Sequence, residues 1–204
     1  MTISSYSDLK AAIQNWFMDR SDIAADFGDE IIGLAEAYFN LNLRCREMEE
    51  VADLTPTSNV CTLPTDYVEY KRVVELASIR RALEYITEDA ADALYPTRSG
   101  GLACHFVIVG SNLTALPLSS NDIELTYYQA IPALSASNAS NWLLTKSPNL
   151  YLHTCLMYAA EAAKARDEYA AEASLVARFV ELLQGADNRG KFGNAGMTLT
   201  GVVW

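Results

Sequence analysis

Four acidic side chains lie close together in the sequence, and paired carboxylates are the usual catalytic groups of glycoside hydrolases. They are Glu47, Glu49, Glu50 and Asp53, and they follow a predicted helix. A hydrolase would need two of them facing each other across a substrate cleft. Because a run of charges after a helix is more often a solvated turn, the sequence favours a structural interpretation of this cluster over a catalytic one.

The other residue types that carry chemistry do not fall into catalytic patterns. His105 lies in a predicted strand and His153 in a predicted helix, and neither has the spacing of a metal ligand. Gly190, Gly193 and Gly196 follow no predicted strand and lack a Gly-Lys-Ser/Thr step, so they do not predict a phosphate-binding loop. We therefore expect a protein that is not an enzyme, with no catalytic residues, no cofactor and no metal.

The cysteines and the hydropathy indicate where the chain is used. The cysteines are Cys45, Cys61, Cys104 and Cys155. They include no Cys-x-x-Cys pair, which predicts reduced and mostly buried thiols. No apolar run approaches the ~20 residues that span a bilayer, and no basic segment followed by an apolar one marks a signal peptide. We expect a chain that is made and used in the cytoplasm, or in a particle assembled there, without membrane contact.

The charge argues against nucleic-acid binding. The 15 Lys and Arg against 26 Asp and Glu give a net charge of −11, and the acids are spread along the whole chain. Proteins that grip nucleic acid gather Lys and Arg into patches. Here the adjacent basic pairs are Lys71-Arg72 and Arg80-Arg81, and neither forms a patch.

Helices are predicted at both ends of the chain. Apolar residues recur at helical spacing over residues 5–18 and over about 27–46. Near the other end, Ser147-Pro148 begins a helix that is predicted to reach about 166, since Ser caps well and Pro is favoured at the first position. The next helix is predicted over about 168–184 and stops at Gly185, which would make an antiparallel hairpin.

Between these helices, short β-like runs alternate with turn residues. The predicted strands are 51–54, 60–63, 72–77, 83–86, 104–109, 112–116 and 122–128, with a short helix at 88–94. A hairpin turn is predicted at 109–112, where Gly110 separates two alternating runs.

These elements predict an α+β chain that is mainly α. We expect an antiparallel helical bundle core within a domain over 1–184, whose helices are about 5–46 and 147–184. A strand-rich insertion would cover about 51–135, and an extended C-terminal arm 185–204. Five glycines in the arm predict poor order without a partner. Its apolar residues could fold back on their own domain, but the poor order of a Gly-rich tail favours docking on another chain. They are Met197, Leu199, Val202, Val203 and Trp204.

Particular segments carry a resemblance to a known family. The first helical pair contains YSDLKAAIQNW (6–16), DEIIGLAE (29–36) and NLR (42–44), and the start of the insertion contains LPTDYVEYKRV (63–73). The most specific stretch is IELTYYQAIPALS (123–135), which runs on into NWLL (141–144) and SPNLYL (147–152). Over roughly the first 185 residues the chain resembles the head-to-tail adaptor, or connector, proteins of short-tailed double-stranded DNA bacteriophages.

This resemblance implies a structural virion protein at the head-tail junction. The family's members would form a homo-oligomeric ring, typically of about twelve copies, beneath the portal protein. The ring would extend the DNA ejection channel and offer a platform to a tail nozzle or tail tube protein, with tail fibres as further candidate partners. An acidic wall would let DNA pass without specific binding. The arm would dock on the portal or on a neighbouring adaptor subunit.

Two other functions stay open at this point. The first is a stopper or head-completion protein at another virion junction, which would share the ring but not the direct contact with the portal. The second is a tail-associated hydrolase that uses the acidic cluster, and the absence of a recognisable catalytic pattern makes it the weaker alternative. We also expect the purified chain to be monomeric or weakly associated until it meets the portal.

Overall fold

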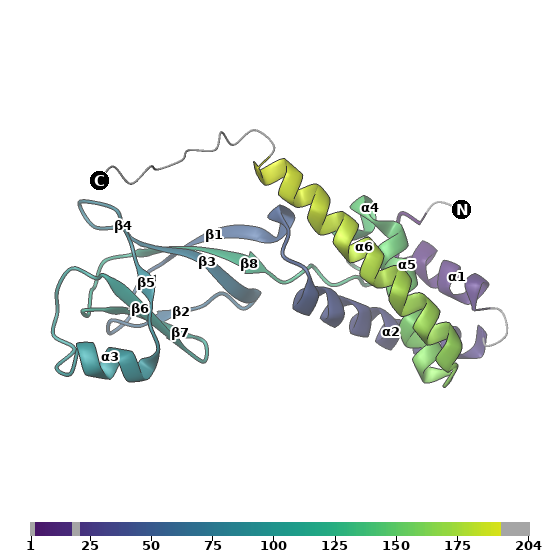
Figure 1. Cartoon of the computed structure of the whole chain (residues 1–204), viewed down its shortest axis with the longest axis horizontal. Helices are drawn as coiled ribbons and strands as arrows, with labels where there is room; N and C mark the ends of the chain where they lie inside the picture. Colours follow the sequence, from purple (N-terminus) through teal and green to yellow (C-terminus); the bar gives the residue numbers. More distant parts are fainter. Residues whose placement is uncertain (1–2, 18–20, 193–204) are drawn as a thin grey trace, which may run out of the picture. The chain divides into compact units, whose positions relative to one another are not determined.

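The computed structural model describes the backbone of residues 3–17 and 21–192, and the side chains of residues 3–17 and 27–190. The chain divides into two compact units, one within Met1–Glu47 and Ile131–Trp204 and the other within Met48–Ala130. We call them the helical unit and the β unit (Figure 1).

The helical unit is built around one buried helix. Its elements are α1 (Tyr6–Trp16), α2 (Ser21–Asn42), α4 (Trp142–Lys146), α5 (Pro148–Ala162) and α6 (Arg166–Phe192). Helix α5 begins with Pro148 as predicted, and nine of its fifteen residues are buried. It packs against α1, α2, α4 and α6, which explains why it is apolar on nearly all sides.

The turn between α5 and α6 has a defined geometry. Lys164 lies in the left-handed region with φ of 60°. Its N–H donates to Glu161 O at 3.0 Å, and the N–H of Ala165 donates to Ala160 O at 2.9 Å. These two bonds form a Schellman motif, a helix ending in which glycine is the usual left-handed residue. The motif ends α5 within three residues of the start of α6 and so produces the predicted helical hairpin.

The β unit contains two four-stranded sheets. The first has the order β1 (Glu49–Leu54), β8 (Ile123–Gln129), β3 (Tyr67–Glu75), β4 (Arg81–Ala82). The second has the order β2 (Cys61–Thr62), β7 (Asn112–Leu116), β6 (His105–Val109), β5 (Glu84–Tyr85). All neighbours are antiparallel except β5 and β6. The predicted hairpin turn joins β6 to β7, with Gly110 at φ of 60°.

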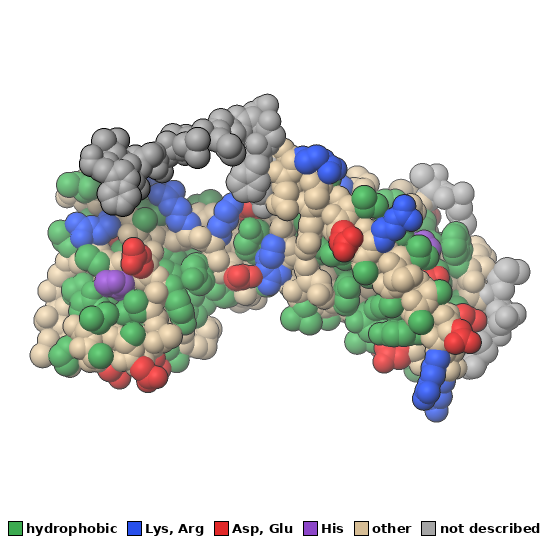
Figure 2. All heavy atoms as spheres, in the orientation of Figure 1, with side chains coloured by type: hydrophobic (Ala, Val, Ile, Leu, Met, Phe, Trp, Pro, Cys, Tyr) green, Lys and Arg blue, Asp and Glu red, His purple; other side chains and the backbone are tan. Residues whose placement is uncertain are grey.

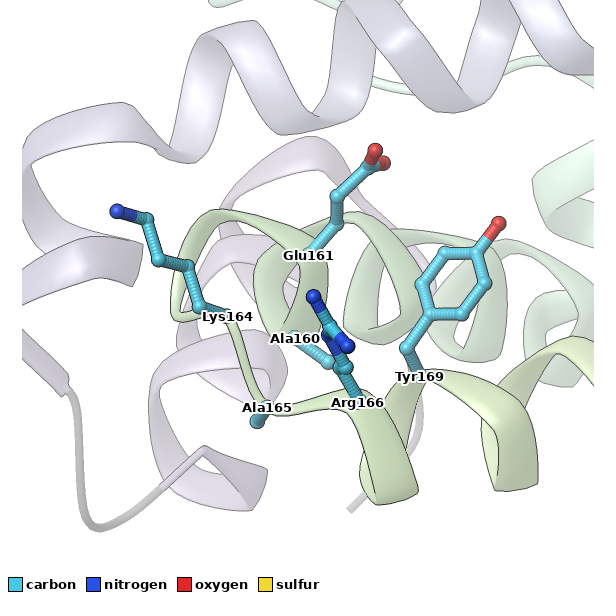
Figure 3. A pocket seen from close by; sticks show the side chains of 6 residues that line it. All are labelled: Ala160, Glu161, Lys164, Ala165, Arg166 and Tyr169. Carbon is cyan, nitrogen blue, oxygen red and sulfur yellow. The ribbon is translucent and has the colours of Figure 1, made fainter.

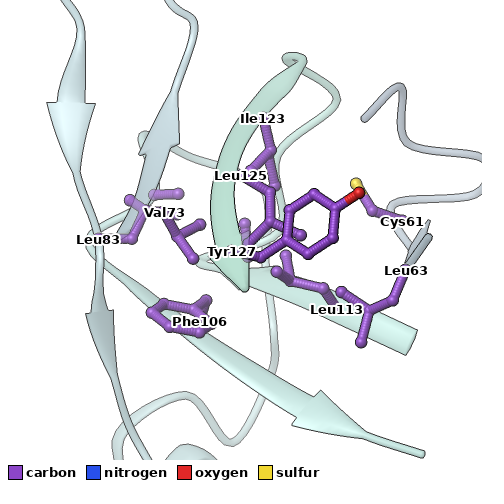
Figure 4. Close-up of a cluster of buried hydrophobic side chains, with 11 residues drawn as sticks. Cys61, Leu63, Val73, Leu83, Phe106, Leu113, Ile123, Leu125 and Tyr127 are labelled. Atoms are coloured by element: carbon purple, nitrogen blue, oxygen red, sulfur yellow. The ribbon is translucent and has the colours of Figure 1, made fainter. Parts of the chain in front are cut away.

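The two sheets share one hydrophobic core (Figure 4). Val73 and Leu125 come from the first sheet, and Phe106 and Leu113 from the second. The chain crosses from the first sheet to the second at Leu83. The N–H of Leu83 donates to Val73 O at 2.9 Å, and the N–H of the next residue, Glu84, donates to Cys104 O at 3.0 Å. Helix α3 (Glu88–Leu94) covers a smaller cluster through Ala91. The β unit therefore has a core of its own.

The expected fold class is wrong. We expected a mainly α chain with an antiparallel helical bundle core and a strand-rich insertion. The structure instead has six helices and two four-stranded sheets in its described part, with 46% of residues helical and 23% in strands. The reason is that the middle of the chain pairs with itself and buries its own core, so no single helical bundle forms the centre of the protein.

The predicted C-terminal end of one helix is also wrong. Helix α6 was expected to stop at Gly185, yet it continues to Phe192. Residues 185–192 therefore belong to this helix rather than to an extended segment. The arm's remaining residues, 193–204, lie outside the described part of the chain. Among the described helices, none combines the length and apolar character that crossing a bilayer requires.

Candidate interaction surfaces

The acidic cluster that could have formed a catalytic pair is dispersed. Glu47 belongs to the helical unit, where its Oε1 accepts a hydrogen bond from Lys146 Nζ at 2.5 Å. Burial raises the pKa of Glu47, but the hydrogen bond and the charge of Lys146, together with a backbone hydrogen bond, hold the pKa below its ordinary value. A carboxyl group with a lowered pKa is poorly suited to act as a general acid.

The other three acids lie on strand β1 and face different ways. Glu49 and Asp53 share one face of the strand, and Glu50 lies on the other, because successive strand residues alternate. Glu49 Oε2 accepts a hydrogen bond from Lys71 Nζ at 2.5 Å, while Glu50 and Asp53 are exposed. This arrangement does not hold two carboxylates across a cleft.

Both histidines are packed against aromatic rings. His105 Nδ1 shares a hydrogen bond with the Tyr95 hydroxyl at 2.6 Å. His153 Nδ1 shares one with Glu172 Oε2 at 2.7 Å, and its ring lies against Trp16 and Phe179. These contacts give both rings packing roles. Over residues 3–17 and 27–190, where side chains are described, no cluster of His, Cys, Asp or Glu could hold a metal ion.

The four cysteines, all of them among the described residues, form no disulfide with one another, and three of the four are buried. These three are Cys45, Cys61 and Cys155, while Cys104 is partly exposed. Burial raises the pKa of the Cys61 thiol to about 11 and raises that of Cys155 as well. Thiols with raised pKa values are poor nucleophiles, as expected for packing residues.

A buried polar network fixes the segment that returns from the β unit to the helical unit. The Tyr151 hydroxyl of α5 donates to Glu36 Oε1 of α2 at 2.7 Å, and the N–H of Leu134 donates to the same oxygen at 2.7 Å. Asn141 Nδ2 donates to Pro132 O at 2.8 Å and contacts the Tyr151 hydroxyl at 3.3 Å. Burial and the neighbouring carboxylate of Glu36 raise the pKa of Tyr151.

This network uses segments that carried the family resemblance. Asn141 also caps α4, because its Oδ1 accepts from the N–H of Leu144 at 2.9 Å. Asn40 Oδ1 accepts from the N–H of Ile131 at 2.8 Å, which fastens the start of the returning segment to α2. The stretch around 131–144 is therefore specific for a structural reason, since its backbone is hydrogen-bonded by the side chains of Glu36 and Asn40 from α2 and of Asn141 at the start of α4.

The last turns of α6 are held by the C-terminal end of α2 and the residues after it. Arg46 Nε donates to Asp187 Oδ1 at 3.0 Å, and Gln184 Nε2 donates to Asn42 O at 2.9 Å. Asp187 is 2% exposed. A buried carboxylate paired with an arginine fixes the position of the helix end from which the arm continues.

The helical unit has a shallow hollow at the corner between α5 and α6, of about 470 Å³ (Figure 3). Lys164, Arg166, Glu161 and Tyr169 line it together with small side chains. Its polar groups carry both signs of charge, so they do not select one class of ligand.

The surface carries exposed apolar side chains on both units. On the β unit, Ile79 at the loop between β3 and β4 is 80% exposed, next to Arg80. Across the face shown in Figure 2, Lys and Arg are scattered among acidic and apolar side chains and form no patch. On α2, Phe27, Leu34 and Leu41 are exposed. Single exposed apolar groups such as Ile79 are common on protein surfaces, whereas a continuous row of them, as on α2, is typical of protein–protein contacts.

The binding residues predicted from the sequence all belong to the arm and lie outside the described residues. They are Met197, Leu199, Val202, Val203 and Trp204. Sequence reasoning also missed Glu36, Tyr151 and Asp187. A signal for Glu36 was present, since it lies in the apolar stripe of α2 between Ile32 and Phe39, where a charged residue needs a partner.

Comparison with known protein families gives a match over nearly the whole chain. The model of a family described as SU10 adaptor protein matches residues 4–197. The match spans both compact units. No curated protein matches the sequence significantly.

Proposed function

The chain belongs to the family of SU10 adaptor proteins, which are structural phage proteins, and we propose that it joins the phage head to the tail as one subunit of a ring. The ring would contain about twelve copies and bind directly beneath the portal protein. Its other side would provide the platform for a tail nozzle or tail tube protein. The observation that carries this proposal is the family match over residues 4–197.

The arrangement of the polar side chains supports a structural role rather than a catalytic one. The acidic cluster is dispersed over salt bridges and strand faces, and both histidines pack against aromatic rings. The net charge of −11 suits a protein through which DNA passes without being held, because few cations are available to displace the counterions of DNA.

The arm is proposed to dock on the portal. It follows α6, whose end is fixed by Arg46 and Asp187, and it closes on Val202-Val203-Trp204. An apolar end that follows a fixed helix can reach a groove or sheet edge of another chain. Binding residues in this proposal are the five apolar residues of the arm.

The structure refines the experiment that tests this function. A truncation after Gln184 would remove Asp187 and disturb the helical unit itself. A chain ending at Phe192 keeps all of α6. We would mix purified portal rings of the same phage with the full chain, with the chain ending at Phe192, and with a variant in which the five apolar arm residues are changed to serine. The matched control changes Asn194, Thr198 and Thr200 to alanine.

The mass of each complex is then measured. The proposal expects about twelve copies on each portal ring for the full chain and the control, and few or none for the truncated and serine variants. Binding by all variants would reject the docking role of the arm and leave the adaptor function standing. If the full chain does not bind the portal, the adaptor function itself is rejected in favour of a stopper or head-completion role.

A further inference from the structure

Helix α2 carries a stripe of large apolar side chains that faces water. Phe27, Leu34 and Leu41 recur every seven residues and therefore lie along one side of the helix. They are 52%, 50% and 79% exposed. Ile32 and Phe39 are buried on the opposite side. An amphipathic helix is expected to face water with its polar side, so this stripe needs a partner.

The stripe has a shape that suits another helix. Glu30 and Ala37 fill the positions between the three large side chains, and both are exposed. The space beside Gly33 is open. We call Phe27, Glu30, Leu34, Ala37 and Leu41 the α2 ridge. It is about 21 Å long, because fourteen helical steps of about 1.5 Å separate Phe27 from Leu41.

The outward side of α6 has the complementary shape. Val176 and Leu183 are buried, and the residues on the opposite side are small or long and polar. We call this side the α6 outer face, and it consists of Ala170, Ala171, Ser174, Ala177 and Arg178, all exposed. Small side chains allow a neighbouring helix with large side chains to approach closely.

The two surfaces point away from each other because α5 lies between the two helices. Tyr151 of α5 contacts Glu36 and Phe39 of α2. His153 contacts Glu172 and Phe179 of α6. Residues two positions apart on a helix lie on nearly opposite sides, at about 200°. Helices α2 and α6 therefore flank α5, and their exposed sides form opposite faces of the helical unit.

Each surface carries one charge and the two signs are opposite, while the exposed acids Asp167 and Glu181 lie beyond the two ends of the α6 outer face. Glu30 on the ridge and Arg178 on the α6 outer face are exposed, and neither has a hydrogen-bond or ion-pair partner among the described residues. No Lys or Arg occurs between residues 27 and 43. Opposite charges on the two faces favour contact between unlike faces, and disfavour ridge-to-ridge contact, where two copies of Glu30 would meet.

From these observations we infer that the α2 ridge of one subunit packs on the α6 outer face of a second copy of this chain. Two different surfaces on opposite sides of a subunit make a head-to-tail contact, which is the kind that repeats around a closed ring. The inference rests on the proposed ring function and assigns the surface by which neighbours meet. One helix pair about 21 Å long offers little area beside the ~1,200–2,000 Å² that stable complexes bury, so free subunits associate weakly.

Cysteine cross-linking tests which faces meet. Leu34→Cys and Ala177→Cys are made separately and together in a chain whose partly exposed Cys104 is changed to serine, and each is oxidised at high concentration and on portal rings. We expect a mixed dimer from the two single variants together, none from either alone, and a ladder of multimers from the double variant. Dimers from Leu34→Cys alone would show a two-fold contact and overturn the inference, as would the absence of a ladder.

Charge reversal provides a second, independent measurement. Glu30→Arg and Arg178→Glu are each expected to reduce the number of copies per portal ring at least several-fold, and the double variant is expected to restore it. Asp53→Arg, an exposed acid outside both surfaces, is the matched control. Single variants that assemble like the wild type would overturn the contact. Loss of portal binding by the wild-type chain would reject the proposed function, whereas a ladder formed without portal would still support the contact.

Discussion

Arg46 and Asp187 form a two-point contact across 141 residues of sequence. Asp187 Oδ1 accepts from the backbone N–H of Arg46 at 3.2 Å and from its Nε at 3.0 Å. The carboxylate is buried, whereas the arginine side chain is half exposed. The contact joins the short segment after α2 to the last turns of α6, and so it fixes the C-terminal part of that helix.

Arg46→Ala should weaken this joint. The carboxylate of Asp187 would lose its guanidinium partner while remaining buried, which costs about 1–3 kcal/mol of unfolding free energy. Hydrogen exchange of residues 183–192 should become faster, and urea unfolding of the full chain should report the loss of stability. Arg189→Ala, an exposed arginine of the same helix, is the control and should change stability by less than about 0.5 kcal/mol. Equal effects of the two changes would contradict a specific role for Arg46.

Gly185→Ala should stabilise the protein. Gly185 lies inside α6 without a positive φ, and an added Cβ would meet Arg189 Nη1 at 3.8 Å, an ordinary contact. Alanine in a helix interior is favoured over glycine by about 0.5–1 kcal/mol. The unfolding midpoint in urea measures the change. A loss of stability would mean that the helix ends at Gly185, as the sequence suggested. Gly190→Ala should gain less, because the Arg46 guanidinium occupies the space of its Cβ.

Helices and strands were predictable where the sequence signal for them lies within a few neighbouring residues. The helix at 88–94 and the strand at 112–116 have the predicted bounds, because capping and alternation act over a few residues. The helix end predicted at Gly185 was wrong because the path of the chain there depends on a distant contact, the hydrogen bond from Gln184 to Asn42 O. Glu36 and Tyr151 are 115 residues apart, and no local pattern identifies them as partners. The fold class was wrong for the same reason, since β1 pairs with β8 and not with a neighbour in sequence.

Tyr151→Phe should destabilise the helical unit. The change removes the hydroxyl that donates to Glu36 Oε1, and it leaves a buried carboxylate with one fewer donor. A loss of about 1–3 kcal/mol is expected, measured by urea unfolding. Tyr169→Phe is the matched control, because Tyr169 is 38% exposed, and it should be nearly neutral. If Tyr151→Phe were equally neutral, the network would not hold the returning segment.

Lys164→Gly should stabilise the α5–α6 hairpin. Lysine at φ of 60° is strained by its Cβ, whereas glycine adopts this conformation freely. The gain is partly offset by the greater freedom of glycine in the unfolded chain, so an increase of about 0.5–1 kcal/mol is expected. Ala163→Gly, at φ of −76°, is the control and should be destabilising. A loss in both variants would exclude the left-handed conformation at Lys164.

Tyr127 should make the stability of the β unit depend on alkaline pH. Its hydroxyl donates to Asp66 Oδ1 at 3.1 Å, and burial, together with this carboxylate, raises the pKa of Tyr127 from about 10 to about 12. The folded state therefore keeps the phenolic proton at a pH where the unfolded chain releases it. The stabilisation is fully present below pH 10 and is lost as the pH rises from 10 toward 12. Because other tyrosines also titrate, the test is a comparison with Tyr127→Phe. The unfolding free energy of the wild type should fall more steeply across this window than that of the variant, and parallel curves would show that Tyr127 contributes nothing to it.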